Sequence, residues 1–239
     1  MIYCDIFRDG RFLMRLICIA DVHDASSRLG FLKGCSADLM VIAGDLHDDG
    51  RPEDAAPVLD ELSRLPQMKL IVPGNMDPKS FAEDLWRSHG LIPIHRSSFV
   101  LGNVGFAGMG GMVARNPRRI GDPTRYYHSD EDIYRTLTDL LRSLRGLERR
   151  VVVVHQPPRG VRDRLYNGEL SGSVGLRRVI EEHQPDLVIC GHIHEDRGTS
   201  SLGDTLVVNV GEARRGYAAL IDLDGLDVEW LTAEWVQYL

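Results

Sequence analysis

Side chains that bind divalent cations recur in five short strings along this 239-residue chain. Each string directly follows an apolar run of the kind that forms buried strands. Imidazole and carboxylate groups together suit transition-metal ions. The sequence therefore predicts a centre for two divalent cations and, with it, a metal-dependent hydrolase. The strings are Asp21-Val22-His23, Gly44-Asp45-Leu46-His47-Asp48, Gly74-Asn75-Met76-Asp77, His155 and Gly191-His192-Ile193-His194.

The ligands divide naturally between two ions. Two cations about 3.5–4 Å apart can lower the pKa of a bound water and clamp the attacking and leaving oxygens of a phosphate ester. We expect Asp45, which follows Gly44 in a tight turn, to bridge the ions. The expected reaction is attack by a metal-bridging hydroxide on phosphorus, with the leaving oxygen departing in line. Asp21, His23 and His194 would complete the shell of one ion, and Asn75, His155 and His192 that of the other.

The charge of this ligand set also favours anionic substrates. Two divalent ions bring four positive charges, and Asp21 and Asp45 remove about two of them, so the site stays electrophilic. An all-oxygen magnesium or calcium cage does not fit the histidines. We expect two divalent transition-metal ions, with manganese as the first choice and iron, nickel, cobalt or zinc as alternatives.

Strands and helices alternate through most of the chain. Residues 15–20, 38–43, 68–73, 151–154 and 186–190 read as strands that end at the five strings. Helical patterns cover residues 52–65, 78–88, 130–145 and 173–183, and residues 205–210, 217–223 and 226–231 read as late strands, with a hairpin turn at Asp224-Gly225. The order predicts an α/β fold of two packed mixed sheets flanked by helices, with its site beyond the carboxyl ends of the strands. Residues 102–127, rich in Gly, Pro and Arg, are expected to form loops.

Length and composition predict one domain over residues 14–239, with residues 1–13 as a possible N-terminal extension. The net charge of -7 argues against general nucleic-acid binding, which needs many phosphate contacts. No apolar run approaches the roughly 20 residues that span a bilayer. Four cysteines without a CxxC pair favour a reduced, cytoplasmic setting. The sequence leaves open whether the chain forms oligomers.

These strings resemble the calcineurin-like metallophosphoesterase superfamily, whose pattern D-x-H, G-D-x-x-D, G-N-x-H/D, H and G-H-x-H is matched from Asp21 to His194. The resemblance implies a four-layer α/β/β/α sandwich and a dinuclear site with the ligands named above. His155-Gln156-Pro157-Pro158, Gly191-His192-Ile193-His194-Glu195 and Val208-Asn209-Val210-Gly211 are most similar to the compact microbial phosphoesterases of the Icc-related type.

Asp77 departs from many members of that superfamily, which carry at this position a histidine assigned as an acid or as a group that orients phosphate. The candidate catalytic residues are Asn75 and Asp77. For Asp77, a catalytic role and a cap for a helix that begins near Pro78 are both open. Asp48 is expected to orient a ligand histidine without binding metal.

The predicted activity is a dinuclear metal-dependent phosphodiesterase acting on a phosphate-ester substrate. Alternatives are a phosphomonoesterase or nuclease of the same superfamily, or a non-catalytic protein-binding scaffold. The substrate-binding residues stay undefined: a loop with Arg115, Arg118, Arg119 and Arg125 could reach a phosphate but reads more simply as solvated. Most other histidines are expected at the surface, with His47 as the one that could approach substrate; the set is His47, His89, His95, His128 and His183.

Overall fold

Two six-stranded sheets form the centre of the protein in the computed structural model, which describes residues 7–8, 11–12, 14–48 and 50–233. The first sheet has the strand order β16-β15-β3-β4-β5-β6 and the second the order β13-β14-β12-β11-β8-β7. The first comprises β3 (Arg15–Ile19), β4 (Leu39–Ala43), β5 (Met68–Val72), β6 (Leu91–Pro93), β15 (Tyr217–Asp222) and β16 (Asp227–Thr232). The second comprises β7 (Ser97–Leu101), β8 (Val104–Met109), β11 (Arg149–Val154), β12 (Leu187–Cys190), β13 (Gly198–Leu202) and β14 (Thr205–Asn209).

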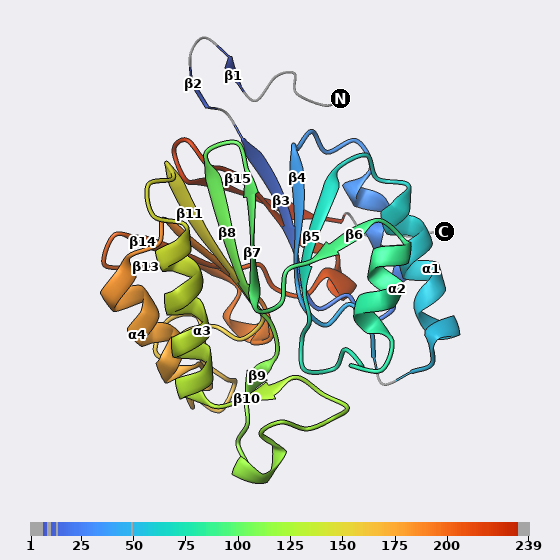
Figure 1. Cartoon of the computed structure of the whole chain (residues 1–239). Helices are drawn as coiled ribbons and strands as arrows, with labels where there is room; N and C mark the ends of the chain where they lie inside the picture. The colour runs from blue at the N-terminus through green and yellow to red at the C-terminus, as the bar shows by residue number, and fades with distance from the viewer. Residues whose placement is uncertain (1–6, 9–10, 13, 49, 234–239) are drawn as a thin grey trace.

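Helices cover the outer faces of both sheets, which gives the layer order α/β/β/α (Figure 1). The four-layer sandwich and the α/β class expected from the sequence are confirmed. Helices α1 and α2 lie beside the first sheet, and α3 and α4 beside the second. Their bounds are α1 Pro52–Ser63, α2 Ala82–Ser88, α3 Asp130–Ser143 and α4 Val174–His183, with short 3-10 turns at Ser26–Leu32, Pro117–Arg119, His194–Asp196 and Ala213–Arg215.

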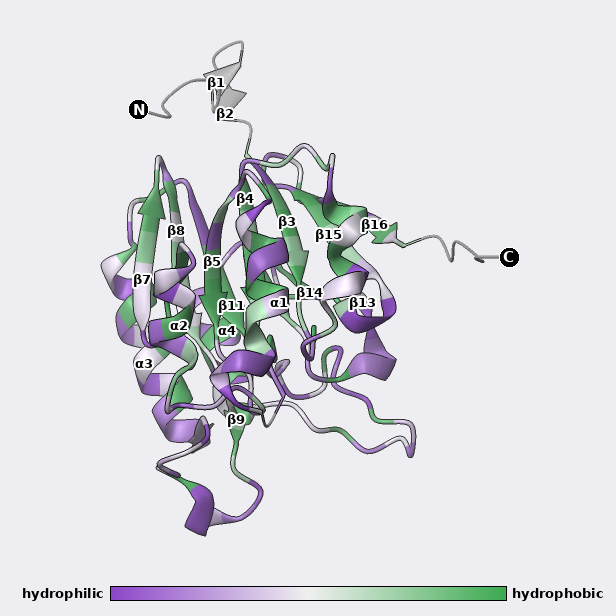
Figure 2. Cartoon of the chain, turned by 90° about the vertical axis from the view of Figure 1, so that its right-hand side faces the viewer, coloured by the Kyte–Doolittle hydropathy of each residue, from purple (hydrophilic) through white to green (hydrophobic). Residues whose placement is uncertain are grey.

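Both faces of the central strands are buried, because each sheet lies between another sheet and a helical layer. On β3, Leu16 and Cys18 pack in the core between the sheets, while Ile17 and Ile19 pack toward α1 and α2. On β11, Val151 and Val153 face the core between the sheets and Val152 faces α3 and α4. This burial explains why the strands read as continuous apolar runs rather than as alternating patterns. Figure 2 shows hydrophobic strands inside and hydrophilic helix faces outside.

Parallel pairing aligns the strands that carry the five strings. Strand β4 pairs in parallel with β3 and with β5, and β11 pairs in parallel with β8 and β12. Their carboxyl ends therefore meet along one edge of the molecule. The later chain closes the first sheet through the antiparallel hairpin β15–β16, whose turn contains the expected Asp224-Gly225.

The expectation of loops over residues 102–127 is wrong for the first part of that segment. Strand β8 is fully buried in the middle of the second sheet, between β11 and β7. Its glycines caused the misreading, yet they are needed there: a Cβ on Gly108 would overlap the carbonyl oxygen of Ile94. Beyond β8 the chain forms the short parallel pair β9 (Met112–Val113) and β10 (Tyr127–His128). The loop between them projects from the carboxyl edge (Figure 1).

The N-terminal segment pairs on itself as β1 (Phe7–Arg8) and β2 (Arg11–Phe12), at the end of the body opposite the β9–β10 loop (Figure 1). The rest of the expected extension, residues 1–6, 9–10 and 13, lies outside the described residues. Among the helices that are described, none combines the length and the apolar character needed to cross a bilayer.

Candidate metal centre

The seven expected ligands gather at the carboxyl edge because each follows a parallel strand. Asp21 and His23 follow β3, Asp45 follows β4, and Asn75 follows β5. His155 follows β11 on the facing sheet, and His192 and His194 follow β12. Six of the seven form two groups in which ligand atoms approach within 4.8 Å of one another: Asp21, His23 and His194 in the first group, and Asp45, His155 and His192 in the second.

Several of these residues adopt left-handed backbone conformations that residues other than glycine rarely take. The φ angles of Asp21, Asp45 and His192 are 55°, 49° and 65°. Such conformations cost of order 1–3 kcal/mol each and persist only where the surroundings enforce them. Here hydrogen bonds do so, because the amide of Asp21 donates to the carbonyl of Gly44 at 3.0 Å, and the amide of His192 donates to Asp21 Oδ2 at 2.9 Å. These hydrogen bonds hold the loops in the conformations that bring the candidate ligands together.

Glycines allow the loops to approach the carboxylates closely. A Cβ on Gly74 would overlap Asp45 Oδ1, and one on Gly191 would overlap Asp21 Oδ2. Both positions therefore need glycine for space. The Gly-Asn and Gly-His parts of the strings are thus structural requirements of the site.

The first group contains a buried acceptor without a donor. Asp21 is fully buried, with His194 Nε2 at 3.1 Å and His23 Nε2 at 3.8 Å from its Oδ1. This Oδ1 has no hydrogen-bond partner among the described residues. A buried carboxylate oxygen in that state is costly, and a cation held between it and the two imidazoles would satisfy it.

The second group is more deeply buried and includes the side chain of Asn75 at its rim. His155 Nε2 lies 3.3 Å from Asp45 Oδ2 and 3.2 Å from Asn75 Oδ1. The His155 and His192 rings lie with centroids 4.9 Å apart. The other oxygen of Asp45, Oδ1, accepts the amide of Met76 at 2.7 Å. Asp45 is thus anchored by one oxygen and offers the other to the group.

Three of the candidate ligand histidines have their second ring nitrogen facing an oxygen. His155 Nδ1 lies 2.8 Å from the carbonyl oxygen of Ala43, and His23 Nδ1 lies 2.6 Å from Asp48 Oδ1. His194 Nδ1 lies 3.7 Å from Glu212 Oε1. Such oxygens fix the ring orientation of metal-binding histidines and leave Nε2 for the metal. Sequence reasoning missed Glu212, although it directly follows the quoted string Val208-Asn209-Val210-Gly211.

The electrostatics of the second group match a site that exchanges a proton for a cation. Burial works to raise the pKa of Asp45, but the adjacent His155 overcomes this and lowers it to about 2. Burial works to lower the pKa of His155, and the charge and hydrogen bond of Asp45 raise it to about 9. Burial and the charge of His155 lower the pKa of His192 to about 4. A divalent cation bound here would replace the proton on His155.

The donor set and its geometry fit two divalent ions. Each group offers one carboxylate and two imidazoles, and the orphaned Asp21 Oδ1 lies within the first. The two His/Asp groups thus suggest a dinuclear site. When bound, such ions would neutralise phosphoryl charge and activate a water.

Asp77 lies beneath this site rather than at its surface. It is fully buried, and its two oxygens accept the amides of His47 at 2.8 Å and Gly74 at 2.7 Å. The expectation that it caps a helix beginning near Pro78 is wrong, because α2 begins at Ala82 with Phe81 as its N-cap residue. Burial and the nearby charge of Asp45 raise the pKa of Asp77 to about 6. Its catalytic role stays a prediction.

Two of the other histidines are buried: His47, the one expected to approach substrate, and His128, which was expected at the surface. His47 is 1% exposed and His128 is 7% exposed. Both ring nitrogens of His47 are engaged, by Asp24 at 2.9 Å and by the Trp86 indole at 2.8 Å. His47 thus does not face a substrate. The sequence could not reveal this burial, because the side chains that enclose His47 come from other segments of the chain.

A cavity of about 350 Å³ is lined in part by Gln156, the residue after His155. Gln156 braces its wall, accepting the amide of Val113 at 2.8 Å and donating to the carbonyl of Ser171. Arg115 donates to Ser171 Oγ at 3.1 Å, and Arg159 lines the same cavity. Asp130 and Glu169 also line it, and one Asp130 oxygen accepts from Ser173 Oγ and the amide of Gly175.

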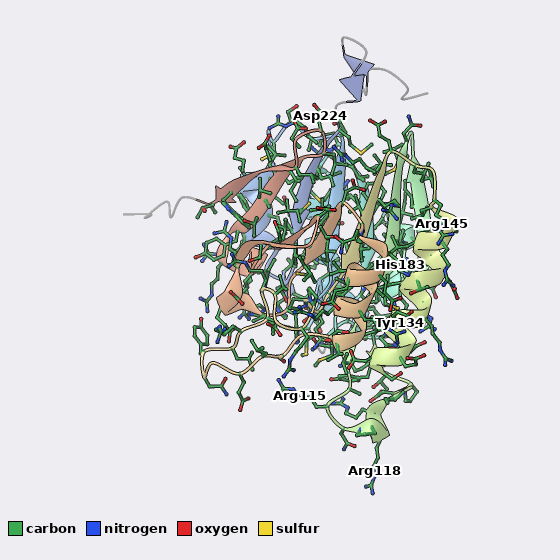
Figure 3. The ribbon with its side chains drawn as sticks, turned by 90° about the vertical axis from the view of Figure 1, so that its left-hand side faces the viewer. Arg115, Arg118, Tyr134, Arg145, His183 and Asp224 are labelled. Atoms are coloured by element: carbon green, nitrogen blue, oxygen red, sulfur yellow. The ribbon has the colours of Figure 1, made fainter. Side chains whose placement is uncertain are left out.

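The other arginines of the β9–β10 loop lie differently. Arg119 stacks on Tyr127 at 4.1 Å and pairs with Asp122 at 3.6 Å. Arg118 points away from the body at the tip of the loop, whereas Arg115 lies nearer to the body (Figure 3). Of the four arginines considered from the sequence, Arg115 is the one that lines the described cavity.

Two curated proteins match most of the chain. The chain is 28% identical over 224 residues to an uncharacterized protein of Methanocaldococcus jannaschii, covering 89% of this chain and 98% of that one. It is 25% identical over 217 residues to a UPF0046 protein of Caenorhabditis elegans, covering 87% and 73%.

Solved structures share the fold at low identity. The TT1561 protein of Thermus thermophilus superposes with a TM-score of 0.72 at 19% identity, covering 92% of this chain and 99% of that one. A dimetal phosphatase from Danio rerio superposes with a TM-score of 0.57 at 12% identity, covering 92% and 98%.

A family model described as metallophosphoesterase, calcineurin superfamily, matches residues 53–232. The matched part contains Asn75, His155, His192 and His194, and the two preceding strings join them at the same edge. The chain belongs to the calcineurin superfamily of metallophosphoesterases.

Proposed function

We propose that this protein is a dinuclear metal-dependent phosphodiesterase. The observation that carries the proposal is the pair of His/Asp groups at the facing strand ends, each with one buried carboxylate and two imidazoles. Asp21 and His194 with His23 would hold one ion, and His155 and His192 with Asn75 the other. Asp45 would lie between the ions. We take manganese as the first metal to test, since the mixed nitrogen and oxygen ligands also accept iron, nickel, cobalt or zinc.

The proposed preference for diesters rests on two features: the negative charge of the buried carboxylates around the site, and the lack of a placed acid to protonate the leaving oxygen. Asp21, Asp45 and Asp77 place three buried carboxylates around the site. A diester brings one negative charge to these groups, whereas a monoester brings up to two. Both Asp77 oxygens already accept main-chain amides, so this residue is not placed to protonate a leaving oxygen. Esters with leaving groups of low pKa need little such help.

We place the part of the substrate beyond the phosphorus in the cavity beside Gln156. Its apolar wall includes Val113, Leu165 and Leu170, and Arg115 and Arg159 contribute guanidinium groups. Arginine binds carboxylate or phosphate through paired donors. The carboxylate of Asp130 already accepts from Ser173 Oγ and the amide of Gly175, which offsets its effect on an anion.

The deciding experiment compares aryl diesters, aryl monoesters and alkyl esters after metal removal and reloading with Mn²⁺. We expect hydrolysis of bis(p-nitrophenyl) phosphate only in the reloaded protein, at a higher rate than p-nitrophenyl phosphate. Rates should fall steeply as the leaving-group pKa rises. Equal activity after chelation would contradict metal dependence, and faster cleavage of the monoester would favour the phosphomonoesterase alternative. Cleavage of single-stranded DNA would favour a nuclease.

We also propose a cytoplasmic location. The support is chemical: Cys18, Cys35 and Cys190 are free thiols, and Cys18 and Cys190 are buried as small apolar side chains. Fractionation of cells that express a tagged chain tests this location.

A further inference from the structure

His47 is buried among the aromatic side chains of Trp86 and Phe81. It follows Asp45 by two residues and is 1% exposed. Its ring stacks on Trp86 of α2 with centroids 6.0 Å apart and lies 6.3 Å from the ring of Phe81. A polar ring enclosed in this way must satisfy both nitrogens or bear a high desolvation cost.

The neighbours of His47 fix its proton. The indole nitrogen of Trp86 can only donate, and it lies 2.8 Å from His47 Nε2. His47 Nε2 must therefore be the unprotonated acceptor, and the ring proton resides on Nδ1. That Nδ1–H donates to Asp24 Oδ1 at 2.9 Å. The two partners thus specify a single arrangement of the ring, with Nδ1 as the donor and Nε2 as the acceptor.

Asp24 passes this constraint to the first ligand group. Its Oδ2 accepts the amide of Asp48 at 2.9 Å, and Asp48 Oδ1 in turn lies 2.6 Å from His23 Nδ1. A chain of hydrogen bonds therefore runs from Trp86 through His47, Asp24 and Asp48 to a candidate ligand. It ends at the nitrogen whose orientation determines where His23 Nε2 points.

The main chain of His47 reaches the second group. Its amide donates to Asp77 Oδ1 at 2.8 Å, and Asp77 Oδ2 accepts the amide of Gly74 at 2.7 Å. Asn75 sits within this Gly74–Asp77 turn. One residue thus holds loops from both groups, through its ring on one side and its amide on the other.

We propose that the His47 side chain is a positioning group for the first ligand group, and that its Nδ1–H bond to Asp24 is the contact that sets His23. The inference rests on the proposed dinuclear site and deepens it. His47 touches neither metal nor substrate in this scheme. Outer partners of ligands commonly change metal affinity by about 10–100-fold when removed.

Two substitutions separate the ring's contacts. In His47→Asn the amide nitrogen falls near the position of Nδ1 and can still donate to Asp24. In His47→Gln the amide reaches toward the position of Nε2 and can accept from Trp86, while the bond to Asp24 is lost. Both remove the imidazole and keep the main-chain amide, so they disturb packing similarly.

The measurement is Mn²⁺ binding to metal-free protein in competition with a chelator, alongside thermal unfolding. We expect His47→Gln to weaken the affected Mn²⁺ by about 10–100-fold and His47→Asn to weaken it by clearly less. Equal losses in both variants, or none in either, would overturn the proposal. Because no substrate is used, a protein that binds two Mn²⁺ but cleaves no ester would defeat the proposed function alone.

The tautomer offers a test on the unaltered chain. We expect ¹⁵N chemical shifts of the His47 ring at neutral pH to show a protonated Nδ1 and an unprotonated Nε2. Trp86→Phe should lose that fixed pattern, whereas Trp230→Phe on β16 should keep it. A protonated Nε2 or a charged ring in the unaltered protein would contradict the inference even if the variants fail to fold.

Discussion

The two ligand groups differ in what holds them. In the second group the side chains of His155 and Asp45 are 0% and 4% exposed, whereas in the first group those of His23 and His194 are 10% and 30% exposed. The second ring nitrogen of His155 faces a main-chain carbonyl. Those of His23 and His194 face carboxylates, Asp48 and Glu212. His155 is therefore oriented by the main chain, whereas His23 and His194 depend on side chains that single substitutions can remove.

Glu212 shows how the more open group is stabilised. It is 1% exposed, and both its oxygens lie 2.7 Å from guanidinium nitrogens of Arg214 and Arg215. A buried carboxylate needs such partners. The first group therefore depends on the carboxylates that face its histidines, and His155 of the second group on a main-chain carbonyl. This contrast predicts that substitutions will act on metal binding and on folding in different proportions.

Asp45→Ala should erase the contrast and have the largest effect. It removes the carboxylate placed between the groups and leaves His155 without its partner at 3.3 Å. We expect loss of both ions, measured as metal per protein, and diester hydrolysis at background. Asp60→Ala, at an exposed position of α1, serves as a matched control. Full activity in Asp45→Ala would show that this residue does not link the ions.

Single-ligand variants should divide by group. His23→Ala and His194→Ala should weaken one Mn²⁺, and His155→Ala and Asn75→Ala the other, by about 10–100-fold or more. His155→Ala should also lower the unfolding temperature most, since it leaves Asp45 buried and unpaired. Metal content and thermal unfolding are measured together. Random loss of both ions across the four variants would contradict the division.

The sequence indicated the candidate ligands of both groups more completely than it indicated the residues around them. Strands that are followed by Asp, Asn or His place those side chains at one edge of parallel sheets, so the candidate ligands could be proposed from their order alone. Glu212, Asp24 and Trp86 could not, because their roles depend on contacts between distant segments. Burial likewise moved His47 from a possible substrate contact into the interior.

The helices and most strands were predictable from their apolar patterns and caps, but the glycine-containing strand β8 was not. The expected helix over residues 130–145 corresponds to α3, with Ser129 accepting the amide of Asp132 as its cap. Strand β8 escaped notice because glycine is uncommon in strands. There, Gly105 and Gly108 admit Leu144 of the α3 end and the carbonyl of Ile94. That need for space becomes visible only once the layers are packed.

Two further histidines, His95 and His128, predict how the stability of the fold depends on pH. Near the same edge, burial and the positive charges of His128, Arg96 and Lys79 lower the pKa of His95 to about 3, against an opposing contribution from Asp132. Burial lowers that of His128 to about 4. Because the folded pKa values lie below the unfolded value, the unfolded chain binds more protons, and stability falls as the pH drops below about 6.5.

Each of these histidines should cost up to about 2 kcal/mol of unfolding free energy between pH 7 and pH 5. We expect His95→Asn to reduce the acid-side loss, measured by denaturant unfolding at several pH values. His89→Asn, at the end of α2, controls for removing a histidine elsewhere. An unchanged acid slope in His95→Asn would show that His95 takes up its proton in the folded state.

The smallest expected effect is that of a substitution in the cavity, which tests whether the leaving group of the substrate binds there. Arg159 is exposed and lines the cavity beside Gln156. Arg159→Ala should raise KM about 5-fold for a diester whose leaving group carries a carboxylate, with kcat and the KM of a neutral diester unchanged, because an exposed charge-assisted contact is worth about 1 kcal/mol. Arg118→Ala is the matched control, since this exposed arginine lies at the loop tip (Figure 3). Equal effects of the two substitutions would indicate general attraction of anions, whereas a change confined to kcat would place Arg159 at the reacting phosphorus and move the leaving group out of the cavity.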